Sequence, residues 1–140
     1  MTWIQPPAGL IPHSGVPLLV GGASRMKARD YYQSAGGTVV ELAVADVQTV
    51  KDLIDALKSL LPFPEWCGSS WDALDDAFEE LREGWSFPVI IIVDGLPELL
   101  GRNRQLGLQT VIRFNGLTEA FSSASAQLEF IYVDDGAERQ

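Results

Sequence analysis

PVIIIVD, residues 88–94, is the stretch of this 140-residue sequence that decides its fold class. Its five aliphatic residues follow one another without a polar residue between them, and Pro88 and Gly95 bound the run. A half-buried strand alternates apolar and polar residues, whereas an unbroken apolar run is typical of a strand buried on both faces. The stretch therefore predicts a strand of a parallel sheet that helices cover on each side.

Three further apolar runs predict additional strands. They are VPLLVGG (16–22), TVVELAV (38–44) and LEFIYVD (128–134). Helical patterns separate the runs, and this alternation predicts an α/β fold with a parallel sheet of three strands, a fourth N-terminal strand and flanking helices. In this interpretation residues 16–44 form a βαβ unit, and we expect 16–22 to lie beside 38–44.

Capping and breaking residues bound the helices between these strands. The predicted N-caps are Ser24, Thr49 and either Ser69 or Ser70, and the predicted stops are Gly36-Gly37 and Pro62. The helical pattern from 96 to 126 contains Gly101, Gly107 and the pair Asn115-Gly116. Because glycine weakens a helix, we expect these positions to divide that region into two or three short helices.

Composition narrows the class of partner. The net charge of −9 and the pI near 4.4 argue against nucleic acid, whose phosphates need clustered Lys and Arg, and favour a basic protein. The sequence shows neither a signal peptide nor an apolar run long enough to span a membrane. The lone Cys67 cannot form an internal disulfide, so we expect a cytoplasmic protein.

The segment FPEWCGSSWDALDDAFEE (63–80) predicts a short helix with two unlike faces. The apolar stripe consists of Trp71, Leu74, Phe78 and Leu81. The opposite face is anionic, because about 100° per residue places its acids within roughly 60° of one another. Those acids are Asp72, Asp76, Glu79 and Glu83, with Asp75 at the boundary of the two faces and Glu80 at the outer edge. Acids four residues apart repel by roughly 0.2–0.5 kcal/mol per pair, so the pattern needs an explanation.

Three explanations of the acidic face compete. It is a solvated helix surface of an acidic protein, a site for a divalent cation, or a protein-binding surface that imitates the phosphates of a polyanion. The third explanation gains support from Trp66 and Trp85, which flank the helix, because aromatic residues beside charges are typical of interaction hot spots.

Catalytic patterns are weak in this chain. The sole histidine, His13, lies in a Pro-rich segment and has no nucleophile pattern around it. Cys67 is most simply a packing thiol, and GGAS (21–24) lacks the spacing of a phosphate-binding loop. We therefore expect no catalytic residues, no bound metal and no cofactor.

The segment 63–80 resembles the central segment of the barstar family, intracellular inhibitors of a secreted guanyl-specific ribonuclease. The matching residues are Pro64, Glu65, Trp66, Gly68, Asp72, Ala73, Leu74 and Asp76. Gly84-Trp85 and Phe87-Pro88, ahead of the apolar run at 88–94, match as well. The element order resembles the family from about Thr38 to Val133.

The resemblance implies a three-stranded parallel sheet flanked by helices and a helix-plus-loop surface that blocks the basic active site of a ribonuclease. The family's acidic contacts correspond to Asp72 and Asp76, and its loop aromatic and glycine to Trp66 and Gly68. Residues 16–134 then form one barstar-like domain, in which 16–37 are an added βα unit. Residues 1–15 are an irregular arm, and 135–140 a polar tail.

The chain also departs from the family pattern. Cys67 replaces a second loop aromatic, Ser69 and Ser70 follow in the loop, and the stretch between Phe78 and Gly84 is longer. A further acidic contact of the family has only Glu119 as a candidate here.

We therefore expect a non-catalytic, cytoplasmic inhibitor of a basic secreted-type ribonuclease, monomeric when free, with no direct contact to nucleic acid or membrane. The predicted partner-binding residues are Trp66, Gly68, Asp72, Asp76, Glu79, Glu83 and Trp85. The alternatives are an interaction or immunity module for another basic protein that is not a ribonuclease, and a metal-dependent enzyme that uses the same carboxylates.

Overall fold

The computed structural model describes residues 18–20, 25–64, 66–85 and 88–133. The predicted arm (1–15) and tail (135–140), together with His13, Ser24 and Glu65, lie outside this range. The elements are β1 (Leu18–Val20), α1 (Arg25–Ser34), β2 (Thr38–Ala43), α2 (Val50–Leu60), α3 (Trp71–Gly84), β3 (Val89–Asp94), α4 (Leu96–Arg102), α5 (Arg104–Ser123) and β4 (Leu128–Val133). No helix in the described part of the chain combines the length and the apolarity needed to cross a membrane.

The strands form one parallel sheet in the order β1-β4-β3-β2. β3 lies between β2 and β4, with Val89 opposite both Thr38 and Leu128. All five aliphatic residues of β3 are fully buried, which confirms the prediction made from the unbroken apolar run. The α/β class and the core of three parallel strands are therefore as the sequence predicts.

The position of the N-terminal strand differs from the prediction. β1 pairs with β4, with Leu18 opposite Ile131, so β1 and β2 lie at opposite edges of the sheet rather than side by side. α1 lies between β1 and β2 in the chain and crosses the face of the sheet between these two edges, where it contacts β2 as well as the middle strands. The cluster around Tyr32 consists of Ile90 and Ile92 from β3 and Ile131 and Val133 from β4, with the partly buried Val39 of β2 packed against it. A helix that crosses the middle strands connects the two edges.

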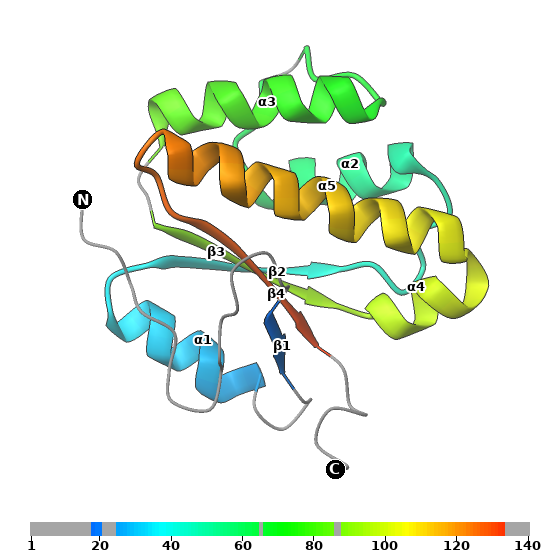
Figure 1. Cartoon of the computed structure of the whole chain (residues 1–140), viewed down its shortest axis with the longest axis horizontal. Helices are drawn as coiled ribbons and strands as arrows, with labels where there is room; N and C mark the ends of the chain where they lie inside the picture. Colours follow the sequence, from blue (N-terminus) through cyan, green and yellow to red (C-terminus); the bar gives the residue numbers. More distant parts are fainter. Residues whose placement is uncertain (1–17, 21–24, 65, 86–87, 134–140) are drawn as a thin grey trace.

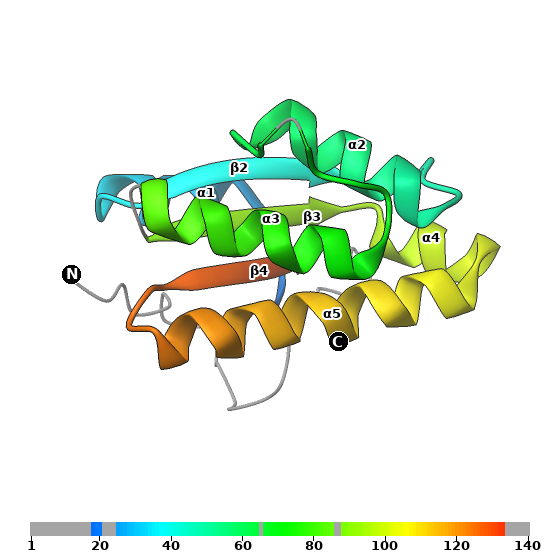
Figure 2. The same cartoon turned by 90° about the horizontal axis from the view of Figure 1, so that it is seen from above.

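The sheet separates two unequal layers of helices (Figure 1). α2, α3, α4 and α5 cover one face, and α1 covers the other. Alternate residues of β3 serve the two faces: Ile91 belongs to the large core beneath the four helices, and Ile90 to the small cluster under α1. Viewed from above, α3 runs between α2 and α5 (Figure 2).

The helical region from 96 to 126 contains one break, at Asn103, and not at the predicted glycines. The Asn103 side chain accepts a hydrogen bond from the backbone N–H of Leu106 at 3.1 Å and so begins α5. Gly107 lies inside α5 because α4 packs against it: a Cβ there would lie 2.6 Å from Leu100 Cδ2. This glycine permits close helix packing, and α5 continues for 20 residues through Gly116.

Candidate protein-binding surface

α3 owes its position to a polar cap and an apolar face. Ser70 is the N-cap, and its side chain accepts a hydrogen bond from the backbone N–H of Ala73 at 3.1 Å. The buried residues of the helix are Leu74, Ala77, Phe78 and Leu81. Phe78 makes edge-on ring contacts with Phe63 at 5.0 Å and with Phe121 at 6.1 Å between centroids. The apolar face thus fixes the direction in which the opposite face points.

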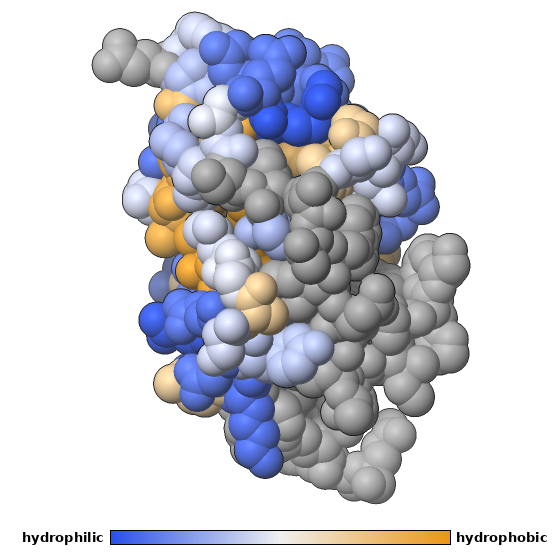
Figure 3. Space-filling view, turned by 90° about the vertical axis from the view of Figure 1, so that its left-hand side faces the viewer, coloured by the Kyte–Doolittle hydropathy of each residue, from blue (hydrophilic) through white to orange (hydrophobic). Residues whose placement is uncertain are grey.

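That opposite face carries the acidic stripe, which we define as Asp72, Asp76, Glu79 and Glu83. All four side chains are exposed. Glu79 pairs with Arg82 at 2.7 Å, but no cation within the described residues pairs with Asp72, Asp76 or Glu83. Hydrophilic residues gather at the top of the space-filling view, where α3 lies (Figure 3). The structure therefore keeps three carboxylates of the stripe available to a partner.

Asp75 lies at the edge of the apolar face, as predicted. It is half-buried, and burial raises the pKa of its carboxyl group, while Arg113 on α5 lowers it and the neighbouring acids raise it further. Arg113 Nη1 is 3.7 Å from Asp75 Oδ2, beyond hydrogen-bonding distance, and its guanidinium lies 5.8 Å from the centroid of the Trp71 ring. Asp75 therefore belongs to the junction of α3 with α5.

The loop before α3 turns one side chain inward and its neighbour outward. Trp66 is 56% exposed, whereas Cys67 is buried, and burial raises the pKa of its thiol. Lys58 Nζ donates a hydrogen bond to the Cys67 carbonyl at 2.7 Å, and the Cys67 N–H donates to the carbonyl of Pro64 at 3.1 Å. These bonds fix a turn that presents Trp66 to solvent, next to the exposed Gly68.

Trp85 lies beyond the other end of α3. It is half-buried, packs against the main core, and caps the helix by donating its N–H to the carbonyl of Leu81 at 3.0 Å. Trp66 and Trp85 thus bracket a helix of 14 residues, about 21 Å long at 1.5 Å per residue. Trp66 is much the more accessible of the two predicted aromatic contacts.

Two further points concern Glu119, the candidate for an additional acidic contact, and the possibility of a metal site. Glu119 is exposed on α5. Among the residues that the structure describes, no three His, Cys, Asp or Glu side chains cluster in a way that could hold a metal ion.

The sequence analysis did not predict that Arg113 and Ile112 lie near α3. Nothing in the sequence indicates that Arg113 faces Asp75, because the packing of α5 against α3 decides it. Ile112 gives a weak signal: it falls off the buried stripe of its own helix and is 69% exposed. An apolar residue on the polar side of a helix is a feature that a sequence can show.

Comparison with known proteins supplies the family. The model of the family described as "Barstar (barnase inhibitor)" matches residues 37–132. The match includes β2, β3, β4, α3 and the loop before α3, and leaves β1 and α1 outside. No curated protein matches the chain closely enough to count as a relative. With most of its length matched to that one model and with the parallel sheet in place, the chain belongs to the barstar family.

Proposed function

We propose that the protein is an inhibitor that binds a basic ribonuclease and covers its active site with α3 and the preceding loop. The observation that carries this proposal is the acidic stripe, in which Asp72, Asp76 and Glu83 are exposed and have no cationic partner among the described residues. The stripe lies within the segment that matches the barstar family. We place the inhibitor in the cytoplasm as a monomer when free.

The geometry suits recognition of an active site that binds RNA phosphates. Carboxylates one helical turn apart, about 6 Å along the axis, offer acceptors to the Lys and Arg side chains that otherwise contact phosphate. Trp66 at the rim of the stripe offers an aromatic anchor. The capped and packed helix is already ordered, so binding costs little conformational entropy.

A binding and inhibition panel tests the proposal. The purified protein is measured against several basic ribonucleases by calorimetry and by RNA cleavage, alongside the double variant Asp72→Ala/Asp76→Ala. We expect at least one nuclease to bind with one-to-one stoichiometry and to lose activity, and the double variant to fail at the same protein concentration. Inhibition that persists in the double variant, or no binding across the panel, contradicts the proposal.

A second candidate is a partner that is basic but not a ribonuclease. The observation that favours it is the loop, where Cys67 is buried and Ser69 and Ser70 are small, so Trp66 is the exposed aromatic residue among those described there. This surface differs from the family pattern at the positions that meet a partner. Binding of basic proteins without nuclease activity, dependent on Asp72 and Asp76, would support this candidate if the ribonuclease panel is negative.

A further inference from the structure

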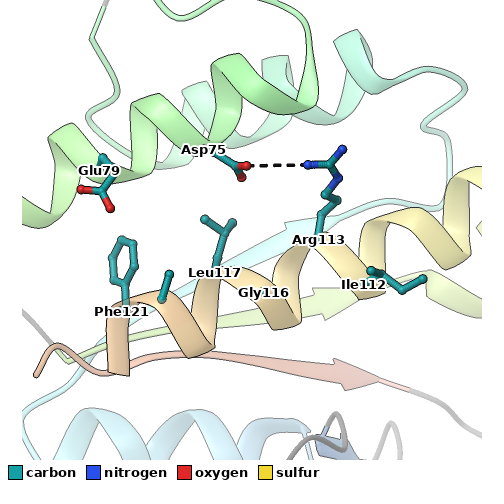
Figure 4. Close-up of a pocket in the computed structure, with 8 residues that line it drawn as sticks. Asp75, Glu79, Ile112, Arg113, Gly116, Leu117 and Phe121 are labelled. Atoms are coloured by element: carbon teal, nitrogen blue, oxygen red, sulfur yellow. Dashed lines mark ion pairs between the residues drawn. The ribbon is translucent and has the colours of Figure 1, made fainter. Parts of the chain in front are cut away.

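The outward side of α5 carries two exposed aliphatic side chains one turn apart. Ile112 is 69% exposed, more than any other large apolar side chain among the described residues, and Leu108 is 47% exposed. The residues of α5 that are buried in the fold are Leu106, Gly107, Thr110, Phe114, Leu117 and Phe121. At about 100° per residue, the centre of this buried stripe lies roughly opposite Leu108 and Ile112. Figure 4 shows Leu117 and Phe121 pointing toward α3, whereas Ile112 does not. Neighbouring aliphatic residues at a position where a helix is usually polar indicate a surface that another molecule covers.

The residues around Ile112 are arranged so that one half of this side complements the other. We define the outer face of α5 as Arg104, Leu108, Ile112, Gly116 and Glu119, which about 100° per residue places within roughly 120° of one another. Leu108 and Gly116 lie about 6 Å along the helix axis on either side of Ile112. Arg104 lies about 12 Å before Ile112, and Glu119 about 10 Å after it. The half before Ile112 therefore offers a cation and a bulky side chain, and the half after it offers an acid and a position without a side chain.

The rest of the described chain leaves both halves of the outer face available. Arg104 and Glu119 are exposed, and neither forms an ion pair with another described residue. A Cβ at Gly116 would meet no atom within 4 Å, and Gly116 borders a groove of about 290 Å³ between α5 and α3 (Figure 4). An apolar side chain from another molecule can therefore pack beside Gly116, and the charges of Arg104 and Glu119 remain free to pair.

We propose that the outer face of α5 binds the same face of a second copy of the protein, with the two helices antiparallel and related by a two-fold axis at Ile112. This axis sets Ile112 against Ile112 of the second copy, and Leu108 of each copy over Gly116 of the other. It brings Arg104 of each copy to within one residue of the position opposite Glu119 of the other. A parallel pair would instead place like charges together. A two-fold interface requires such self-complementarity, because both copies contribute the same residues.

The small size of the outer face limits the strength of this dimer. A stable interface uses about 20–30 residues from each side, far more than one face of a helix provides. The net charge of −9 on each copy adds repulsion, which salt screens. The dimer is therefore a property of concentrated protein, and the dilute protein remains monomeric, in agreement with the proposed function.

Sedimentation equilibrium tests the proposal, with protein from about 10 µM to about 1 mM and in about 0.3 M salt to screen the repulsion. We expect a reversible equilibrium between monomer and dimer. Leu108→Ser should weaken dimerisation at least fivefold, whereas Leu60→Ser, which changes an exposed leucine at the end of α2, should not. Both side chains are exposed, so both variants should fold, and urea unfolding checks this. Monomer alone at the highest concentration, or equal weakening by the two variants, overturns the proposal.

Charge reversal tests the antiparallel geometry. Arg104→Glu and Glu119→Arg should each weaken dimerisation at least threefold, and the double variant should restore it. The two single changes shift the net charge in opposite directions, so overall repulsion cannot explain a loss in both. Opposite effects of the single variants, or no recovery in the double variant, show that the proposed pairing is wrong. The assay contains no nuclease, so its result stands whether or not the proposed function does.

Discussion

The acids that face α1 and the acids of the acidic stripe differ in whether they have a cationic partner. Below the sheet, Arg25 on α1 reaches Asp94 at 2.9 Å, and Arg29 reaches Glu41 at 3.1 Å. Above it, three of the four acids of the acidic stripe have no cation among the described residues. The first arrangement uses acids to hold a helix onto the sheet, whereas the second leaves three exposed acids without a cation among the described residues.

The apolar cores on the two sides of the sheet also differ, in size. The four helices above the sheet share a large continuous core, whereas the small cluster under α1 consists of Tyr32 and apolar residues of β3 and β4, with Val39 of β2 packed against it. α1 also lies outside the family match. We infer that binding resides above the sheet, and that changes to α1 should affect stability without affecting binding.

The largest effect is expected from removing Asp76, the carboxylate at the middle of the acidic stripe. Asp76→Ala should weaken partner binding by at least ~3 kcal/mol, with Asp72→Ala next and Glu80→Ala below ~1 kcal/mol, because a central, water-excluded carboxylate dominates such an interface. The magnitude is that of charge pairs buried in other interfaces, including barnase with barstar. Titration calorimetry on the three variants measures it.

Stability of the same variants provides the control. Asp76→Ala removes like-charge repulsion along α3, so its free energy of unfolding in urea should equal or slightly exceed that of the wild type. If all three variants lose binding equally, or if Asp76→Ala does not fold, then the acidic stripe does not differ in role from the acids that pair with α1.

The second prediction concerns Tyr32, which makes the main apolar contact of α1. Tyr32 is 1% exposed and sits over the small cluster, so Tyr32→Ala should lower the free energy of unfolding by about 3 kcal/mol. The neighbouring Tyr31, at 38% exposure, should lose less on the same substitution. Urea unfolding measures both. A folded Tyr32→Ala variant that binds its partner more than tenfold more weakly would show that α1 takes part in binding.

A smaller effect is expected from the ion pairs beneath the sheet. Arg25→Gln removes the contacts to both Glu41 and Asp94, but these side chains are more than a third exposed. Partly exposed pairs contribute roughly 0.2–1 kcal/mol, and we expect a loss in that range that shrinks in high salt. Lys51→Gln, which breaks an exposed pair with Asp55 on α2, is the matched control and should lose less. A salt-independent loss from Arg25→Gln would point to packing instead of charge.

The sequence predicts those parts of the fold that depend on local pattern. The apolar run of β3, the cap at Thr49 and the cap at Ser70 are all confirmed. Two predictions were wrong where tertiary packing decides the outcome: β1 pairs with β4 rather than with β2, and α5 continues through Gly107, which packs closely against Leu100. The predicted acidic face is indeed exposed, but the approach of Arg113 to Asp75 brings together two helices that no local pattern connects.

The smallest expected effect concerns Glu129, which lies on β4 opposite Ile90, on the face that α1 covers. Burial raises the pKa of its carboxyl group above the ordinary 4.5, although a hydrogen bond with Gln127 lowers it. Stability from such a group is fully present below its unfolded pKa and is lost as pH rises through the folded pKa, because the folded state then holds a poorly solvated charge. Glu129→Gln stays neutral and can still accept that bond, so this variant should be more stable than the wild type at pH 7 and lose its advantage toward pH 4. Urea unfolding at the two pH values decides the matter, since an advantage of the same size at both would mean that ionisation of Glu129 is not responsible. Partner binding at pH 7 should not change, because Glu129 belongs to the side of the sheet where the fold, and not the partner, determines what an acid contacts.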